Sequence, residues 1–272
     1  MNNITLTKEM LEYEYKNCRS LRKMSNKLCI ERTALTKYMK LYNIPYGKHP
    51  TTYICNEKFF QTDTPENFYI AGFIAADGSV REQKYSKVLK IALSSNDRLH
   101  LEKIKKALNS DHVIKTYAVK SSPLVNSKNI YSVDELTITS SNIFNDLQRF
   151  NIVPNKTYSY QFPEWLINHP MVNHFMRGYI DGDGSICSSI RNNYSSKQVS
   201  ISLLGRLLFL KSFNNILIKQ CKIVGSKIVI KSNETYRIRY SGNQQCKIIG
   251  EFLYKNATIF LDRKFDKIKT LL

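Results

Sequence analysis

The sequence predicts an internally duplicated protein of helices and strands, preceded by a small all-α domain. Two similar segments ending in Asp-Gly place Asp77 and Asp183 106 residues apart, and strand-like segments follow each of them. Residues 5–45 instead carry only short helical patterns. The chain has 272 residues, of which 42% are hydrophobic, enough to bury one large core or two smaller ones. This composition excludes a disordered or collagen-like chain.

Several classes of protein are excluded by segments that the chain lacks. The longest apolar run, Phe68 to Ala76, is nine residues long, whereas a membrane-spanning helix needs about 20. Residues 1–5 lack the basic and apolar regions of a secretory signal. The six cysteines form no C-x-x-C pair, which favours reduced, packed thiols over a zinc site. We therefore expect a protein of the cytoplasm or of an organelle, without a membrane partner and not secreted.

The charge distribution points to a polyanionic partner. The net charge is +19, from 41 Lys and Arg against 22 Asp and Glu. Residues 1–50 hold ten basic and four acidic residues, and residues 184–272 hold sixteen and four, whereas residues 51–183 are nearly balanced. Basic segments that contain Tyr and Asn favour nucleic acid over an anionic membrane, because neither segment predicts an amphipathic helix with a broad basic face.

Residues 1–46 predict a domain of three short helices. Thr7 can cap a helix to about Tyr15, and Ser20 can cap a second helix, Leu21 to Leu28. A turn at residues 29–31 leads to a third helix, Arg32 to Leu41. Helices this short are unstable alone and must share a core. Residues 47–66 contain prolines and a glycine without helical periodicity, which predicts a linker.

These helices resemble the helix-turn-helix family. Ser25 in the second helix and Cys29 in the turn stand where the family usually has Ala and Gly. Cys29 must therefore adopt the positive φ that glycine takes without strain. The resemblance implies that the third helix enters the major groove of DNA. The expected contacts are Arg32, Thr33, Thr36, Lys37 and Lys40. A plain three-helix domain with a solvated basic face is the alternative.

The repeat consists of residues 68–80 and 175–186, each followed by the same series of elements. Strands are expected at 88–93 and 131–138 in the first copy, and at 198–203 and 236–240 in the second, with apolar helices after them. Lys156 follows Asp77 by 79 residues, and Lys264 follows Asp183 by 81 residues. This parallel spacing indicates an internal duplication.

Each copy opens with a helix that we expect to end at its aspartate. Gly78 and Gly184 are expected at the left-handed position after the helix end. Small residues such as Gly72 and Gly178 allow two helix backbones to approach closely, which would bring the two C-terminal ends together. Two carboxylates would then lie at the negative ends of two helix dipoles, an arrangement that costs about 0.3–1 kcal/mol each.

A bound divalent cation would remove this conflict. Mg²⁺ accepts carboxylate, backbone carbonyl and phosphate oxygens together. We expect Asp77 and Asp183, with the carbonyls of Ala76 and Gly182, to hold two or more Mg²⁺ ions against scissile phosphates. A plain Asp-Gly turn is the alternative, but its presence at matched places in both copies favours the metal site.

The motifs IAGFIAADG at 70–78 and MRGYIDGDG at 176–184 resemble the two motifs of a monomeric LAGLIDADG homing endonuclease. The resemblance implies an α+β, pseudo-twofold αββαββα fold with antiparallel sheets forming a DNA-binding saddle, in halves 67–165 and 166–272. It also implies Mg²⁺-dependent double-strand cleavage of DNA, leaving short 3′ overhangs, and assigns the essential carboxylates to Asp77 and Asp183. The earlier acidic position of the motif is Ala75 in the first copy and Asp181 in the second.

Lys156 and Lys264 match the basic residue that the family often places near each active site. An ammonium group there could stabilise charge on the phosphorus or lower the pKa of an attacking water. A phosphate contact, or a merely solvated lysine, is the alternative.

The polar faces of the sheets are expected to lie over the major groove. The expected contacts are Arg81, Gln83, Lys87 and Lys90 in the first half, and Arg191, Asn193, Lys197, Lys227, Arg237 and Arg239 in the second. Strands of about eight residues in two sheets would span about 16–18 base pairs. Because the halves differ in sequence, the target should be asymmetric.

Three functions are compatible with this interpretation of the sequence. The first is a site-specific endonuclease that cuts duplex DNA, the second a DNA-binding regulator that no longer cuts, and the third an RNA maturase that helps an intron fold. Both aspartates are present, which favours the nuclease over the regulator. A helix-turn-helix suits the major groove of DNA better than that of RNA, which disfavours the maturase.

Overall fold

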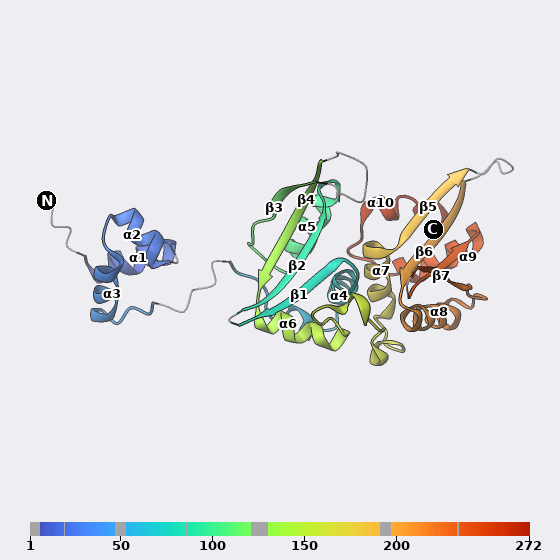
Figure 1. Ribbon diagram of the computed structural model, residues 1–272, viewed down its shortest axis with the longest axis horizontal. Helices are drawn as coiled ribbons and strands as arrows, with labels where there is room; N and C mark the ends of the chain where they lie inside the picture. Colours follow the sequence, from blue (N-terminus) through green and yellow to red (C-terminus); the bar gives the residue numbers. More distant parts are fainter. Residues whose placement is uncertain are drawn as a thin grey trace. The chain divides into compact units, whose positions relative to one another are not determined.

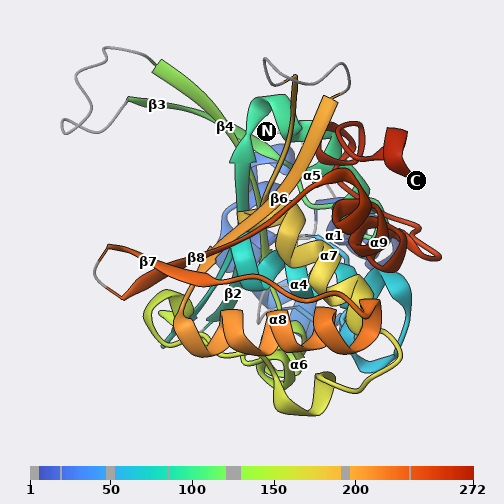
Figure 2. The same cartoon turned by 90° about the vertical axis from the view of Figure 1, so that its right-hand side faces the viewer.

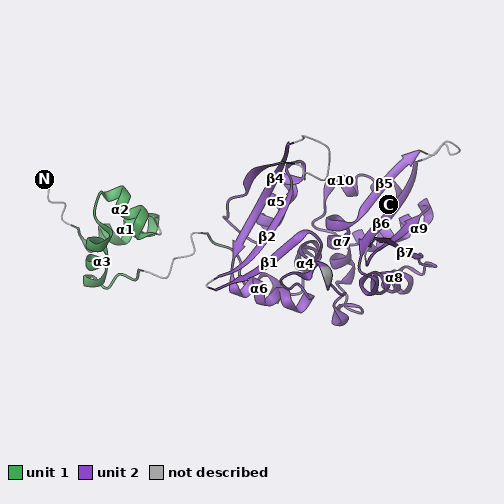
Figure 3. Cartoon of the chain, in the orientation of Figure 1, with its two compact units in different colours: residues 1–54 green, residues 55–272 purple. Residues whose placement is uncertain are grey.

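The structure, a computed structural model, describes residues 6–18, 20–46, 53–84, 86–120, 130–190, 197–232 and 234–272. The chain divides into two compact units, residues 1–54 and 55–272 (Figure 3). Residues 55–66, predicted as linker, belong to the larger unit, because the aromatic side chains of Phe59 and Phe60 are buried in its core. Within the described ranges, no helix combines the length and apolarity needed to cross a bilayer.

The smaller unit is a bundle of helices α1 (Lys8–Cys18), α2 (Leu21–Leu28) and α3 (Arg32–Leu41). The predicted bounds of α2 and α3 are confirmed, whereas α1 continues three residues beyond Tyr15. Cys29 has φ 53°, the left-handed conformation expected of this turn, and the Ser25 hydroxyl donates to the Ile30 carbonyl at 2.6 Å. The shared core consists of Leu6, Leu11, Met24, Leu35, Met39 and Ile44.

The larger unit repeats the order αββαββα twice (Figure 1). The first copy contains α4 (Pro65–Asp77), β1 (Gly78–Gln83), β2 (Ser86–Ser94), α5 (Arg98–Ala107), β3 (Lys115–Lys120), β4 (Ile130–Thr139) and α6 (Ser141–Leu147). The second contains α7 (Val172–Asp183), β5 (Ser185–Ile190), β6 (Lys197–Gly205), α8 (Leu207–Cys221), β7 (Ile228–Ser232), β8 (Thr235–Ser241) and α9 (Asn243–Tyr254). A short helix, α10 (Asp262–Phe265), follows. The predicted strands and the duplication are confirmed.

Each copy forms a four-stranded antiparallel sheet, in the order β1-β2-β4-β3 and β5-β6-β8-β7. Helices α5 and α6 pack on one face of the first sheet, and α8 and α9 pack on one face of the second (Figure 2). Apolar side chains alternate along the central strands toward these helices, as Leu89, Ile91 and Leu93 do in β2. The opposite face of each sheet carries polar residues, and none of the described helices packs against it.

Helices α4 and α7 lie side by side between the two sheets and are the centre of the core (Figure 1). Thr64 caps α4 by accepting from the Asn67 amide at 3.3 Å, and Pro65 takes the first helical position, where no intrahelical N–H bond is needed. Every α4 residue from Asn67 to Ala75 is buried, and so is every α7 residue from Val172 to Asp181. The pair of helices therefore fixes the relative position of the two copies.

Candidate active site

The C-terminal ends of α4 and α7 abut because glycines face the neighbouring backbone. A Cβ on Gly72 would overlap the Phe175 carbonyl oxygen, and a Cβ on Gly178 would overlap the Tyr69 carbonyl oxygen. A Cβ on Gly182 would overlap the Ala76 side chain. The contacts of Gly72 and Gly178 are reciprocal between the copies, as a pseudo-twofold axis requires. The prediction that small residues bring the helix ends together is confirmed.

The glycines after the two aspartates have a different role from the one predicted. Gly78 has φ −85° and Gly184 has φ −77°, so both are extended and neither is left-handed; that expectation is wrong. The chain passes directly from the helix into the first strand of each sheet. A Cβ at either glycine would collide with the preceding turn, at 2.7 Å from Ile74 Cγ2 or 2.6 Å from the Ile180 carbonyl oxygen. Glycine is therefore required for close passage of the chain.

Asp77 and Asp183 lie at these abutting ends and interact electrostatically. Partial burial, and then the negative charge of Asp183, raise the pKa of Asp77 from 3.8 to about 6. Partial burial also raises the pKa of Asp183. Both carboxylates are still exposed at the surface of the site and can reach a ligand. The ionised form of each carboxylate is therefore less favourable here than in water.

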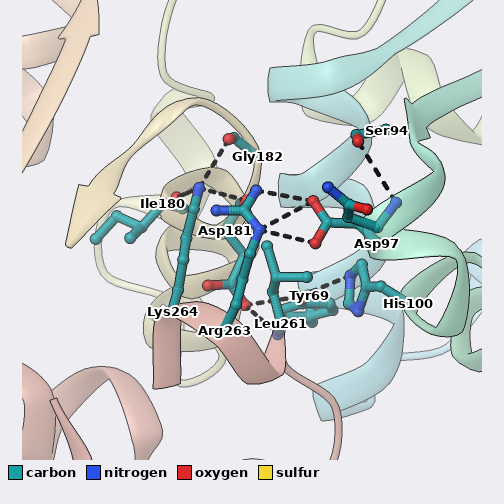
Figure 4. Close-up of polar contacts among 11 residues, drawn as sticks. Tyr69, Ser94, Asp97, His100, Ile180, Asp181, Gly182, Leu261, Arg263 and Lys264 are labelled. Carbon is teal, nitrogen blue, oxygen red and sulfur yellow. Dashed lines mark hydrogen bonds and ion pairs between the residues drawn. The ribbon is translucent and has the colours of Figure 1, made fainter. Parts of the chain in front are cut away.

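Lys156 and Lys264 are buried beside these carboxylates, at 7% and 4% exposure. The Lys156 ammonium donates to the Gly78 carbonyl at 2.8 Å. The Lys264 ammonium donates to the carbonyls of Ile180, Asp181 and Gly182 at 2.8, 2.6 and 2.9 Å (Figure 4). Burial lowers the pKa of both lysines, that of Lys264 to about 8. The two lysines were predicted as equivalent, but they make different contacts.

Each of the two aspartates is influenced more by the lysine of the other copy than by the lysine of its own copy. The charge of Lys156 lowers the pKa of Asp183 more than the charge of Lys264 does, and for Asp77 the order is reversed. Lys156 and Asp183 also line one cavity of about 220 Å³ together with Ala76 and Arg206. The site is therefore composite, because groups from both copies lie beside each aspartate.

Asp181 is buried beneath the site at 1% exposure and joins the two copies (Figure 4). Its Oδ2 accepts from the Tyr69 hydroxyl at 2.7 Å and from the Leu261 amide at 2.8 Å. The Tyr69 hydroxyl also lies 3.1 Å from His100 Nε2. Burial raises the pKa of Asp181 to about 6. Asp181 therefore serves packing between the copies and does not reach the surface of the site.

Arg263, next to Lys264, forms a bidentate ion pair with Asp97 of the first copy (Figure 4). Its Nε lies 2.7 Å from Asp97 Oδ1, and its Nη2 lies 2.8 Å from Asp97 Oδ2. Sequence reasoning missed Asp97, Tyr69 and Arg263, because a contact between distant segments leaves no spacing signal. For Arg263 alone there was a signal, because it is the neighbour of Lys264 in the sequence.

The donor set is compatible with a hard divalent cation. Two carboxylates meet at the helix ends, and their mutual repulsion is the conflict that a dication would relieve. The Gly182 carbonyl, predicted as a ligand, already accepts a hydrogen bond from Lys264. The described residues contain no group of three or more His, Cys, Asp or Glu that could hold a metal. Mg²⁺ would thus complete its coordination with water and phosphate oxygens.

Strand register decides which of the predicted DNA contacts lie on the open face of the first sheet. Arg81 and Gln83 pair across from Val88 and Ser86 and share the open face with Lys90. Lys87 lies on the helix-covered face, where its ammonium contacts Asn145 Oδ1 at 2.9 Å. Because alternation has period two, Lys87 and Lys90 must lie on opposite faces, so the prediction for Lys87 is wrong.

In the second sheet, Arg237 and Arg239 lie on the open face, paired across from Leu204 and Ser202. Lys197 shares the parity of buried Val199, on the helix-covered side, so its predicted placement is wrong. Lys227 directly precedes β7, and Arg191 and Asn193 lie outside the described residues. Open-face residues that were not predicted include Lys115, Tyr117, Thr137, Gln198, Ser200 and Ser202.

On helix α3 the predicted contacts form a surface beside the buried residues Leu35 and Met39. Its members are Arg32, Thr33, Thr36, Lys37 and Lys40; all are exposed except Thr36, which is half-buried. The Thr36 hydroxyl donates to the Arg32 carbonyl at 2.8 Å. Three of the five side chains are cationic, so this face of the smaller unit suits a polyanion.

Comparisons with known proteins agree with this architecture. Residues 64–151 match the model of a family described as a LAGLIDADG-like domain. The homing endonuclease I-WcaI bound to its DNA recognition sequence is similar in structure, with a TM-score of 0.56 and 13% identity, over 83% of this chain and 96% of that chain. The meganuclease I-SmaMI bound to uncleavable DNA gives a TM-score of 0.50 and 14% identity, over 75% and 88%. No curated protein matches the sequence. The duplicated unit thus has the fold of the LAGLIDADG homing endonucleases.

Proposed function

We propose that this protein is a homing endonuclease that makes Mg²⁺-dependent double-strand breaks in a long, asymmetric DNA target. The observation that carries the proposal is the meeting of Asp77 and Asp183 at the abutting ends of α4 and α7. Two neighbouring carboxylates repel each other when ionised, so their placement does not stabilise the fold. It does suit a site that binds cations and phosphates.

The residues of the site divide the work of phosphodiester hydrolysis. Asp77, Asp183 and the Ala76 carbonyl would hold Mg²⁺. When bound, this ion offsets phosphate charge and lowers the pKa of a coordinated water. Lys156 presents an ammonium group to the charge that develops on the phosphate. The open faces of the two sheets, with Arg81, Arg237 and other polar residues, position the duplex.

The test is to incubate the protein with a library of long duplexes and Mg²⁺, and then to sequence the cut ends. We expect one target class with staggered ends. Asp77→Asn and Asp183→Asn should each abolish double-strand cutting while DNA affinity without Mg²⁺ changes less than threefold. Asp266→Asn, at an exposed carboxylate of the second copy, is the control and should cut normally.

Full cutting by either of the two motif variants would refute the joint role of the carboxylates. Sequence-specific binding by the wild-type protein, without any cutting, would instead indicate the regulator.

We further propose that the smaller unit is a helix-turn-helix domain that extends the DNA footprint at one end of the target. The basic face of α3 and the left-handed turn at Cys29 support this assignment. Replacing Arg32 and Lys37 together by Ala in the full chain should shorten the protected footprint without moving the cut positions. A footprint of unchanged length would count against the domain's role in binding.

A further inference from the structure

We propose that the two half-sites are chemically unequal: Lys156 contacts the phosphate held over Asp183, whereas Lys264 only holds the end of α7, so one DNA strand is cut faster. This inference rests on the proposed nuclease function and concerns how the two copies share it. It follows from the different hydrogen bonds of two lysines that occupy matching places in the repeat.

The Lys264 ammonium has no donor left for DNA. An ammonium group carries three N–H donors, and Lys264 directs hydrogen bonds to three carbonyls, those of Ile180, Asp181 and Gly182. These carbonyls belong to the last turn of α7; that of Ile180 also accepts from the Gly184 amide at 2.9 Å, whereas those of Asp181 and Gly182 lie beyond the last backbone hydrogen bond of the helix. The cation also lies at the negative end of the helix dipole. If the ammonium left this position, the carbonyls of Asp181 and Gly182 would lose the hydrogen bond that it donates, with no other donor to them among the described residues.

The segment that carries Lys264 is fixed on both sides. On one side, the Leu261 amide donates to buried Asp181. On the other, Arg263 forms its bidentate pair with Asp97 of the first copy (Figure 4). Lys264 itself is 4% exposed. Its ammonium group therefore stays on the helix end when DNA occupies the open faces of the sheets.

Lys156 has a different setting at the end of α4. To the residues that the structure describes, its ammonium donates one hydrogen bond, to the Gly78 carbonyl at 2.8 Å. Ala75 stands where the second copy has Asp181, so no matching carboxylate ties the lysine segment to this helix. Lys156 lines the cavity of about 220 Å³ that also contains Asp183 and Arg206. Two of its N–H donors are thus available to a phosphate that enters beside Asp183.

The step that Lys156 assists is hydrolysis of one phosphodiester bond. A water oxygen forms a bond to phosphorus and loses a proton to solvent, while the bond from phosphorus to the leaving sugar oxygen breaks. The leaving oxygen takes up a proton from solvent, so the atoms balance without a further reactant. Hydrogen bonds from Lys156 to a non-bridging oxygen would stabilise the charge gained in the transition state.

The experiment measures the nicking of each strand separately. The duplex target found with the library carries a different fluorophore on each 5′ end, and single-turnover rates are followed with saturating protein and Mg²⁺. We expect the wild-type protein to nick the two strands at different rates. Lys156→Met should slow the faster nick about 100-fold, the size of effect seen when one transition-state donor is removed. The slower nick should change less than threefold, so nicked duplex accumulates.

Lys264→Met should lower the melting temperature and slow both nicks by a similar factor, leaving their ratio unchanged. Lys264→Arg is the second variant in case the methionine protein does not fold. Lys247→Met, at an exposed lysine of α9, is the matched control and should behave like the wild-type protein.

Equal slowing of both strands by Lys156→Met would overturn the inference, and so would a selective loss of one nick in a folded Lys264 variant. A wild-type protein that nicks neither strand would overturn the nuclease function itself. The two failures are therefore distinguishable.

Discussion

The two copies of the repeat hold their helix ends by different means. In the second copy, Asp181 and Lys264 tie the end of α7 to the segment at 261–264 through buried hydrogen bonds. In the first copy, Ala75 offers no such group, and among the described residues the Lys156 ammonium donates a hydrogen bond only to the Gly78 carbonyl, after the helix. The glycines at the helix interface are matched, whereas these side chains are not. Duplication therefore preserves the backbone contacts that fix the two halves and allows the surrounding polar groups to diverge.

The largest expected effect is a loss of stability at the glycine contacts between α4 and α7, which both copies share. Gly72→Ala and Gly178→Ala should each lower the free energy of unfolding by about 3 kcal/mol or more, because each new methyl group meets a backbone carbonyl that cannot move aside. The losses should be similar, measured by urea unfolding. Gly205→Ala is the control, since its nearest neighbours lie at 3.4 Å or beyond and form ordinary contacts. Wild-type stability of either interface variant would contradict the close approach.

Acid sensitivity tests one buried group of the second copy. Burial, and then the charge of Arg177, lower the pKa of His174 from 6.5 to about 4, and its Nδ1 lies 2.8 Å from Arg177 Nη1. As the pH falls from 6.5 to 4, the unfolded chain binds the proton first, so folded-state stability is lost over this window. The loss reaches about 3 kcal/mol at most and does not grow below pH 4.

His174→Gln keeps an acceptor for Arg177 but does not titrate. Urea unfolding at pH 7 and pH 4 should therefore show a smaller acid-induced loss for the variant than for the wild-type protein. Every other titratable group is common to both proteins and largely cancels from the difference. Equal losses in the two proteins would exclude His174 as the origin.

Replacing Asp181 tests the buried hydrogen bonds that the second copy has and the first copy lacks. Asp181→Ala should lower the free energy of unfolding by about 2 kcal/mol, because the buried Tyr69 hydroxyl and Leu261 amide each lose an acceptor. Asp266→Ala, whose exposed carboxylate pairs only with Lys269 among the described residues, should change stability by less than about 0.5 kcal/mol. Thermal or urea unfolding of both variants provides the measurement. If the two losses were equal, the buried hydrogen bonds would not distinguish the halves.

The smallest effect concerns the ends of the matching helices α5 and α8. Both are followed by a left-handed residue, Asn109 with φ 45° in the first copy and Lys222 with φ 53° in the second. Asn tolerates this conformation better than Lys because its short side chain can hydrogen-bond locally. Lys222→Asn should therefore raise stability by about 0.5 kcal/mol. A melting temperature that falls would show that the lysine side chain makes a compensating contact.

Much of the architecture could be predicted because it depends on local or repeated patterns. The cap of α2, the alternation in β2 and β6, and the small residues of the two motifs are each visible in short segments. The faces of Lys87 and Lys197 were predicted wrongly, since a face depends on which neighbours are buried. A shift of the strand pairing by one residue moves each side chain to the opposite face of the sheet. Gly78 and Gly184 were assigned the wrong conformation because a glycine after a helix has two possible causes: a positive φ or a close neighbour.

The sequence by itself determined the repeat, the helices that end at Asp77 and Asp183, and the basic character of the chain. Only the tertiary structure decided that Lys264 gives its donors to the end of α7 while Lys156 faces a cavity with Asp183, and that Asp97 and Arg263 link the copies. The physical reason is that periodicity and spacing act within one segment. Hydrogen-bond partners and burial, in contrast, are set where segments 80 or more residues apart come into contact.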